Sequence, residues 1–403
     1  MAISLPKKNQ NRSVILECIF RNAPISRVEI SDLTKITPAT VTANITELIN
    51  EGIVYETGDT SGDNNSSGRK RILIDIVPDK AFSIGVEFTQ RALTVCLTNL
   101  KGTIISSNII PFENLSLDII TEEIISEIHK ILNTSKIQLE SIIGIGIAVP
   151  GHMNKTNTKL ITNNKIWGSF NPSIIRSEFP FPVIIENNVH CMTLGQYLFY
   201  PKNTPSNFIY FHVSYGMFCS HITNGRIYYK DNFMLGEIGH TIVDISGPHC
   251  ECGKHGCLQT YASESWLLKN ARILFENSSK TYLKSLVDNS SEIKINDILT
   301  AYSMGDPFIS NYISNAIKYL GVSISNLSII LGTQKIYLHG VLFDNELLKK
   351  ELLYFINQQL LFVDTEYNCN IEILQINTTD GAVGASALSI FNFFINEYPF
   401  VDL

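Results

Sequence analysis

Residues 236–257 read GEIGHTIVDISGPHCECGKHGC, and this stretch decides how the rest of the chain is interpreted. It carries three of the eight cysteines, Cys250, Cys252 and Cys257, within eight residues. Thiols this close together on a glycine-rich loop are typical of metal ligands in a protein that keeps its cysteines reduced. Together with one imidazole they form the four-ligand tetrahedral set that binds structural zinc.

Three histidines of the stretch compete for the fourth ligand position. His249 is adjacent to Cys250, and adjacent residues cannot easily bind one ion, which disfavours it. His240 precedes Cys250 by ten residues, and His255 lies between the last two cysteines. The residues alone leave the choice between His240 and His255 open.

Short apolar runs lie on both sides of this loop and form a repeat. Three predicted strands lie at 82–87, 92–98 and 103–107. The same pattern of three strands occurs again about 126 residues later, at 208–213, 217–223 and 226–229. Further predicted strands alternate with helices at 142–149, 183–185, 335–339 and 371–376. The repeat predicts two similar α/β lobes, and small ligands usually bind in the cleft between such halves.

Polar residues follow or precede these strands at positions that line the expected cleft. Gly151 follows the strand at 142–149, and Asn187 and Asn188 follow the strand at 183–185. Glu237 precedes the cysteine loop. Amide and carboxylate groups that converge in this way form a hydrogen-bonding set for a polyhydroxylated ligand.

The first 75 residues have a different pattern. Amphipathic helices are predicted at 12–20, 27–33 and 38–50, and two apolar strands at 53–56 and 71–74 flank a polar loop. Ser26 and Glu29 form a capping box before the second helix, and Thr37 followed by Pro38 begins the third. This order of elements is the winged helix-turn-helix pattern, although helices alone would also suit a packing or dimerisation module.

The third helix is the predicted DNA-recognition helix. Val41, Ile45, Leu48 and Ile49 are expected to face the core. The residues expected to face DNA are Pro38, Ala39, Thr40, Thr42, Ala43 and Asn44 of this helix, with Arg69 and Lys70 of the wing. Thr40, Thr42 and Asn44 are the candidates for base contacts, and Arg69 and Lys70 those for phosphate or minor-groove contacts.

Composition supports a folded chain of several domains. The 403 residues are 44% hydrophobic and 17% charged, with a net charge of −7. Residues 1–75 hold nine basic and nine acidic residues, so any DNA contact depends on individually placed cations. No apolar run approaches the roughly 18 residues of a membrane helix and no signal peptide precedes the first helix, so we expect a cytoplasmic protein without a membrane partner.

From about residue 5 to residue 394 the chain resembles the ROK family of repressors and sugar kinases, and specifically its repressors with an N-terminal winged helix. The matching pieces are residues 236–240 with the three cysteines, Gly144–Gly151, Glu186-Asn187-Asn188, residues 380–385, and Ser66–Lys70. The resemblance implies a two-lobed actin-like ATPase (ribonuclease H-like) fold. It also implies zinc bound by His240, Cys250, Cys252 and Cys257, and a sugar contacted by His240 and Glu237.

The chain departs from the kinases of this family at the positions that carry catalysis. Asn188 stands where the kinases have the aspartate that takes the proton of the sugar hydroxyl, and an amide cannot accept a proton near neutral pH. Residues 87–90 read EFTQ where the kinases have a glycine-rich phosphate loop, and His339-Gly340 replaces a Gly-Gly pair used for adenosine. Gln259 replaces a glutamate, so the pocket is expected to hold fewer anions than a kinase pocket.

These observations predict a winged helix at 1–75, a first lobe at 78–200 completed by a C-terminal helix at 386–403, and a second lobe at 201–385 with the metal loop at 240–257. The predicted protein is no enzyme but a homodimeric or homotetrameric repressor of carbohydrate-metabolism genes. A sugar or sugar phosphate in the interlobe cleft would release it from double-stranded operator DNA. The predicted effector-binding residues are Gly151, Asn187, Asn188, Glu237, His240 and Gln259. The alternatives are a catalytic sugar kinase with a DNA-binding domain, and a repressor controlled by a protein partner.

Overall fold

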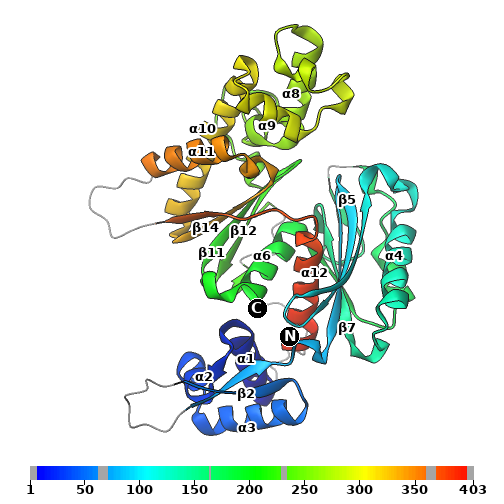
Figure 1. Ribbon diagram of the computed structural model, residues 1–403, viewed down its shortest axis with the longest axis vertical. Helices are drawn as coiled ribbons and strands as arrows, with labels where there is room; N and C mark the ends of the chain where they lie inside the picture. Colours follow the sequence, from blue (N-terminus) through cyan, green and yellow to red (C-terminus); the bar gives the residue numbers. More distant parts are fainter. Residues whose placement is uncertain (1–6, 62–70, 163–164, 228–233, 360–368, 397–403) are drawn as a thin grey trace. The chain divides into compact units, whose positions relative to one another are not determined.

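The chain folds into two compact units. The computed structural model describes residues 7–61, 71–162, 165–227, 234–359 and 369–396. One unit contains Met1–Thr204 and Thr378–Leu403, and the other contains Pro205–Asn377 (Figure 1). Within the described ranges, no helix combines the length and the apolar composition that crossing a bilayer requires.

The N-terminal part of the first unit is a winged helix. Helices α1 (Lys7–Asn22), α2 (Arg27–Thr34) and α3 (Pro38–Asn50) pack beside a sheet of order β1-β3-β2, formed by β1 (Ile25–Ser26), β2 (Val54–Ser61) and β3 (Arg71–Ile76). Both predicted helix caps are present. The Ser26 side chain accepts from the backbone N–H of Glu29, and the Glu29 side chain accepts from the backbone N–H of Ser26. The Thr37 side chain accepts from the backbone N–H of Thr40 and caps α3. The short strand β1 was not predicted, since two residues carry no periodic signal.

The first lobe is a five-stranded sheet of order β10-β7-β4-β5-β6. Its strands are β4 (Phe82–Phe88), β5 (Ala92–Asn99), β6 (Ile104–Pro111), β7 (Ile142–Val149) and β10 (Val183–Asn187). The strands β4, β5 and β6 are antiparallel, whereas β7 and β10 run parallel to β4. A two-stranded ribbon, β8 (His152–Met153) with β9 (Leu160–Ile161), and helix α5 (Pro172–Glu178) precede β10.

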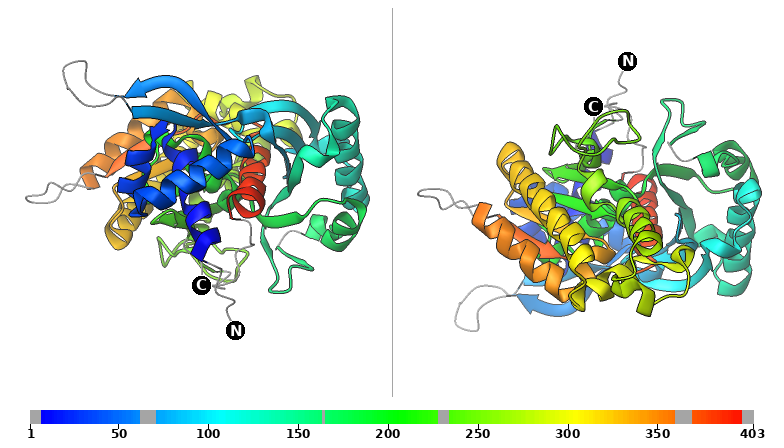
Figure 2. Two further views of the ribbon diagram at one scale, coloured as in Figure 1. Left: turned by 90° about the horizontal axis from the view of Figure 1, so that it is seen from below. Right: turned by 90° about the horizontal axis from the view of Figure 1, so that it is seen from above.

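Helices cover both faces of this sheet, with α4 (Ile120–Ser135) on one face and α6 (Asn188–Phe199) and α12 (Asp380–Ile390) on the other (Figures 1 and 2). Ile84 and Val86 belong to the core cluster that contains the apolar side chains of α4, so the alternate residue Gly85 points to α12. A Cβ on Gly85 would lie 1.8 Å from the carbonyl oxygen of Ala382. Glycine is therefore required for α12 to approach the sheet.

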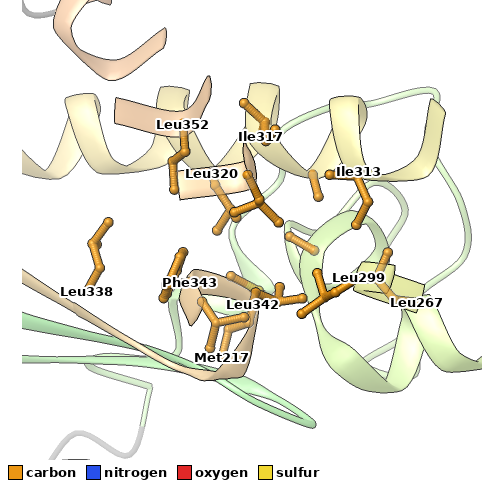
Figure 3. Packing of buried hydrophobic residues seen from close by; sticks show 14 of the residues in the cluster. Met217, Leu267, Leu299, Ile313, Ile317, Leu320, Leu338, Leu342, Phe343 and Leu352 are labelled. Atoms are coloured by element: carbon orange, nitrogen blue, oxygen red, sulfur yellow. The ribbon is translucent and has the colours of Figure 1, made fainter. Parts of the chain in front are cut away.

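The second lobe repeats the strand order of the first, as the sequence repeat predicted. Its sheet has the order β13-β12-β11-β14-β15, with β11 (Phe208–Val213), β12 (Met217–Thr223), β13 (Arg226–Ile227), β14 (Lys335–His339) and β15 (Asn370–Ile373). The helices of this unit are α7 (Gln259–Ala262), α8 (Glu264–Asn277), α9 (Ile295–Ser303), α10 (Pro307–Leu331) and α11 (Glu346–Gln359). Figure 3 shows part of the core that joins them, including Leu338, Leu342, Phe343, Ile317, Leu320 and Leu352.

The division of the chain differs in detail from the predicted boundaries. The chain enters the second unit at Pro205 and returns to the first at Thr378, whereas the predicted second lobe spans 201–385. The predicted start of the last helix, residue 386, lies inside α12. Helix α12 is buried along almost its whole length, so it has no apolar stripe from which its start could be recognised.

Candidate functional site

The exposed N-terminal face of α3 is the candidate DNA-binding surface. Pro38, Ala39, Thr42 and Ala43 are exposed, as expected, whereas Thr40 is half-buried. The Thr42 hydroxyl donates to the carbonyl oxygen of Pro38 (2.8 Å). Small side chains at this end of the helix leave room for the edges of base pairs in a major groove.

The prediction that Asn44 faces outward is wrong. Asn44 is 5% exposed, and its Nδ2 donates to the carbonyl oxygen of Thr40 (2.9 Å). It follows Val41 by three residues and precedes Leu48 by four, so helical geometry places it on the buried face whatever its polarity. Asn44 therefore cannot reach a base edge without a change in the packing of α3.

Lys35 is a cation that the sequence reasoning missed at this surface. It is exposed and lies between α2 and α3 in the left-handed conformation (φ 59°). The turn before a recognition helix commonly lies against the DNA backbone, which makes Lys35 a candidate phosphate contact. Arg69 and Lys70, the predicted wing contacts, lie outside the described residues.

The second unit brings together the predicted metal ligands. One ligand atom from each of His240, Cys250, Cys252 and Cys257 lies within 4.8 Å of the others. His240 Nδ1 is 3.6 Å from Cys250 Sγ, and Cys252 Sγ is 3.6 Å from Cys257 Sγ. A tetrahedron with metal–sulfur bonds of about 2.3 Å has edges of about 3.8 Å, so the four atoms could hold a metal ion with little movement.

The surrounding loop explains why His240 joins the cysteines and the other two histidines do not. The backbone pairs His249 with His255, and their rings pack edge to face at 5.1 Å. The carbonyl oxygen of His240 accepts from Lys254 Nζ (2.7 Å), which ties His240 to the loop. These contacts place the His240 imidazole, and not that of His255, in the group of thiols.

Gln259 lies beside this group, at the start of α7. Its Nε2 is 3.4 Å from Cys250 Sγ and donates to it. A donor to a ligating thiolate orients that ligand and lowers its basicity. The structure therefore gives Gln259 a role beside the metal ligands, in addition to the predicted contact with an effector.

Glu237 lies in the loop before His240 and is half-buried. Its backbone N–H donates to the carbonyl oxygen of Met234 (3.3 Å), and its carbonyl oxygen accepts from the N–H of His240 (3.0 Å). These two bonds fix the backbone on both sides of the Glu237 carboxylate. The position of that carboxylate is therefore set by the same turn that presents the His240 ligand.

In the first unit, Asn187 holds the loop that contains Gly151. Asn187 is 4% exposed, and its Nδ2 donates to the carbonyl oxygen of Gly151 (3.0 Å). Its Oδ1 accepts from the backbone N–H of Val189 (2.9 Å) and caps α6. Asn187 therefore uses both of its polar atoms to fix the backbone at the ends of β7 and β10.

Asn188, the first residue of α6, contacts a carboxylate. Its Nδ2 is 3.3 Å from Glu87 Oε1 and donates to it. Glu87 lies near the end of β4, and its pKa is raised to about 7: burial raises it most, the hydrogen bond from Asn188 lowers it, Asp380 raises it and Arg91 lowers it. Glu87 therefore places one ionisable carboxyl group beside Asn188, and the expectation that the pocket holds fewer anions than a kinase pocket stays a prediction.

A second carboxylate nearby is already paired. Glu186 Oε1 accepts from the backbone N–H of Asn187 (2.7 Å) and lies 3.2 Å from His190 Nδ1. Burial favours the neutral form of Glu186, but His190 and the Asn187 amide outweigh it, so the pKa of Glu186 is lowered. Glu186 therefore stays ionised near neutral pH, in contact with the His190 ring.

The position that the family uses for adenosine holds imidazoles. His339, at the end of β14, is buried, and its Nδ1 lies 2.9 Å from His212 Nδ1 at the end of β11. The next residue, Gly340, has φ 144°, and a Cβ there would lie 2.1 Å from the carbonyl oxygen of Val213. Side chains therefore occupy space that a Gly-Gly pair would leave open.

Comparisons with known proteins agree with this geometry. The model of the ROK family matches residues 83–391, and a winged helix-turn-helix DNA-binding model matches residues 8–55. The xylose repressor of Bacillus spizizenii is 30% identical over 339 residues, which is 84% of each chain. The N-acetylglucosamine repressor of Escherichia coli O6:H1 is 24% identical over 94% of this chain and 92% of its own.

Two solved structures show the same fold. A ROK family transcriptional regulator described as a homologue of the E. coli MLC protein superimposes with a TM-score of 0.74 at 22% identity, over 96% of this chain and 98% of its own. A ROK family glucokinase from Streptomyces griseus, solved with glucose and AMPPNP, superimposes with a TM-score of 0.62 at 20% identity, over 76% of this chain and 99% of its own.

Proposed function

The chain belongs to the ROK family, and on that premise we propose that it is a DNA-binding repressor of carbohydrate-metabolism genes that a sugar releases from its operator. The observation that carries the proposal is a winged helix with an exposed recognition face, joined to a kinase-like domain in which Asn188 contacts a carboxylate instead of serving as a base. The names of the relatives, xylose and N-acetylglucosamine repressors, support it.

A kinase function is disfavoured by the same residues. Phosphoryl transfer to a sugar needs a group that takes the hydroxyl proton, and the Asn188 amide cannot do so. Residues 87–90 and His339-Gly340 replace the glycine-rich sequences that the resemblance assigns to nucleotide binding in the kinases. We therefore infer that the kinase-like domain binds a sugar without turning it over.

We propose that two of these protein chains bind a two-fold operator, because one winged helix reads only a half-site. The full-length protein should select a duplex from a random library, and that duplex is the probe for the experiments below. Failure to select any sequence would contradict the proposed function.

Lys35→Ala should weaken binding to the selected duplex and reduce the salt dependence of log Kd by about 1, because one phosphate contact is lost. Lys136→Ala is the matched control, since Lys136 is also an exposed lysine that ends a helix in the left-handed conformation (φ 55°). Fluorescence anisotropy across a salt series measures the affinity and its salt dependence for both variants. An unchanged salt dependence of log Kd for Lys35→Ala would remove Lys35 from the DNA-binding surface.

Thr42→Ala should change the sequence preference of DNA binding with little effect on the salt dependence of log Kd.

We propose that His240, Cys250, Cys252 and Cys257 bind a structural zinc ion. Three thiolates and one imidazole suit zinc, and the four ligand atoms leave no open position for catalysis. When bound, zinc would cross-link the two ends of the loop at 240–257, just before the start of α7. The His240 imidazole would then have one nitrogen on the metal and its other N–H available to a sugar oxygen.

The purified protein should contain about one zinc per chain, and Cys252→Ser should lower that content and the melting temperature together, because metal binding stabilises only the folded loop. Cys18→Ser removes a thiol in α1, outside the group, and should change neither. Elemental analysis and thermal denaturation of freshly purified, unchelated protein are the measurements. Absence of zinc from the wild-type protein would contradict the assignment.

We propose that the effector contacts Asn188, Glu237 and His240, with Asn187 fixing Gly151 and Gln259 supporting the group of thiols. Sugar hydroxyls both donate and accept, and these residues offer amide, carboxylate and imidazole partners. The hydrogen bonds from Asn187 to Gly151 and from Gln259 to Cys250 support a positioning role for both residues.

Helix α6 connects the sugar-binding residues of the first unit to the winged helix. It begins at Asn188 and, two and a half turns or about 13.5 Å further, carries Tyr197. The Tyr197 hydroxyl donates to Glu17 Oε1 of α1 (2.9 Å), and the guanidinium of Arg21 lies 3.9 Å from the centre of its ring. Arg21 also donates to the carbonyl oxygen of Thr204 (2.6 Å). We propose that movement of α6 on sugar binding reorients α1 through Tyr197.

Tyr197→Phe should leave operator affinity within a few-fold of wild type but reduce the change in that affinity on adding sugar by about 10-fold. The substitution removes a hydrogen bond to a charged group, worth about 1.5 kcal/mol or more, and keeps the ring under Arg21. Tyr200→Phe is the control, because Tyr200 lies in the same region but is 60% exposed. Operator titrations with and without sugar measure the ratio of the two operator affinities in each variant. Equal ratios in wild type and Tyr197→Phe would show that α6 does not couple the sites through this hydroxyl.

A further inference from the structure

A carboxylate inside the metal loop joins the loop to two helices of the second unit. Asp244 Oδ2 accepts from the hydroxyl of Tyr261 in α7 (3.0 Å) and from the hydroxyl of Tyr319 in α10 (3.2 Å). Asp244 Oδ1 accepts from the backbone N–H of Ser246 (3.0 Å), and the two tyrosine rings lie 4.2 Å apart between their centres. Asp244, Tyr261 and Tyr319 together form a loop anchor, and none of them is a predicted metal ligand or effector contact.

The backbone of Asp244 lies directly against the residue that precedes a metal ligand. The N–H groups of Val243 and Asp244 donate to the carbonyl oxygen of Gly256, at 2.9 and 3.3 Å. A Cβ on Gly256 would lie 1.4 Å from the carbonyl oxygen of Asp244, so only glycine permits this close approach. Cys257 follows Gly256 in the chain. A displacement of Asp244 would therefore also displace the Cys257 thiol.

Helix α10 gives the loop anchor a fixed position in the second unit. Tyr319 lies between Ile317 and Leu320, whose side chains are buried in the core of the unit (Figure 3). Tyr261 belongs to α7, whose residue Ala262 is buried in the same core. The hydrogen bonds to Asp244 therefore attach the middle of the metal loop to the core, and they do so without a metal ion.

The loop anchor needs a carboxylate at position 244. Donors reach both of its oxygens, whereas an asparagine side chain has one acceptor oxygen and one NH₂ group that can only donate. The hydrogen bonds from Ser246, Tyr261 and Tyr319, with a smaller effect of Lys318, outweigh burial and lower the pKa of Asp244. Asp244 is therefore ionised at neutral pH and can accept from all three donors.

We propose that Asp244 is a positioning residue for the metal site, and that Tyr261 and Tyr319 hold it so that the four ligands stay assembled when no metal is bound. The inference rests on the proposed zinc ion. A loop that already has its bound shape loses little conformational freedom when the metal binds. Without the loop anchor, only a fraction of the metal-free molecules would have the ligands assembled, and the apparent Kd for zinc would rise as that fraction falls.

Competition for zinc between the full-length protein and a chromophoric chelator measures the zinc Kd. The variants are Tyr319→Phe, which removes one donor to Asp244 and keeps the ring, and Asp244→Asn. Tyr302→Phe is the matched control, because the Tyr302 hydroxyl donates to another carboxylate of the same unit, Glu351 Oε2 (2.7 Å), and joins α9 to α11. Amide hydrogen exchange of residues 241–258, followed by mass spectrometry with and without zinc, reports the order of the loop itself.

Tyr319→Phe should raise the zinc Kd about 5-fold and Asp244→Asn roughly 10-fold or more, whereas Tyr302→Phe should change it less than about 2-fold. In the metal-free proteins, residues 241–258 should exchange faster in Asp244→Asn than in wild type, and zinc should restore slow exchange. An unchanged zinc Kd in both loop-anchor variants, or equal exchange in the metal-free wild type and Asp244→Asn, would overturn the inference and leave the zinc site in place. A wild-type protein that binds no zinc would instead contradict the zinc site, and this inference with it.

Discussion

Glu237→Ala should give a protein that binds its operator normally and is not released by the sugar that releases the wild type. In the proposed site the Glu237 carboxylate accepts from two sugar hydroxyls, and each hydrogen bond to a charged group is worth about 1.5–3 kcal/mol. Their loss should raise the sugar concentration for half-release by roughly 100-fold or more. The two backbone hydrogen bonds of Glu237 do not involve its side chain, so the turn before His240 should persist in the variant.

Release of a labelled operator duplex during a sugar titration measures this effect. Glu292→Ala, which removes an exposed carboxylate of the same unit, should respond as the wild type does. Zinc content and melting temperature should be unchanged in Glu237→Ala, which separates a lost sugar contact from a damaged metal loop. A normal response in this variant would place the effector site elsewhere and favour control by a protein partner.

Signals that act within a few residues were predictable from the sequence. The capping box of Ser26 and Glu29 and the Thr37-Pro38 start of α3 are present in the structure because each depends only on residues three or fewer positions away. The similarity of the two lobes was predictable from the repeat, since similar apolar patterns fold alike, whereas their strand order is known only from the structure. In the same way, the spacing of three cysteines identified the thiol group before its geometry was known.

Other features depend on contacts that no local pattern encodes. Asn44 was placed on the wrong face because its polarity outweighed its position relative to Val41 and Leu48. Glu87 and Asn188 are 101 residues apart, and their contact needs Gly381 of a third segment. Spacing alone also could not separate His240 from His255, because the pairing of His255 with His249 arises only when the loop folds.

The buried carboxylate of Glu87 should also make the stability of the first unit depend on pH. Burial, with Asp380, raises its pKa from 4.5 to about 7, so the folded protein binds a proton that the unfolded chain releases between these values. Stability contributed by the neutral form is fully present below about pH 4.5 and is lost as pH rises to about 7. The loss is about 3 kcal/mol, because each pKa unit corresponds to about 1.4 kcal/mol.

Glu87→Gln removes this ionisation and should therefore be more stable than wild type at pH 8, while the two proteins should be similar at pH 5, where most of the Glu87 in the folded state is protonated. Urea unfolding followed by a probe in the first unit, at both pH values, measures the difference. Glu140→Gln should show no such dependence, because Glu140 is exposed. A stability difference between wild type and Glu87→Gln that is the same at pH 5 and pH 8 would mean that Glu87 ionises as readily in the folded protein as in the unfolded chain. The carboxylate against α12 would then be hydrated in the folded protein.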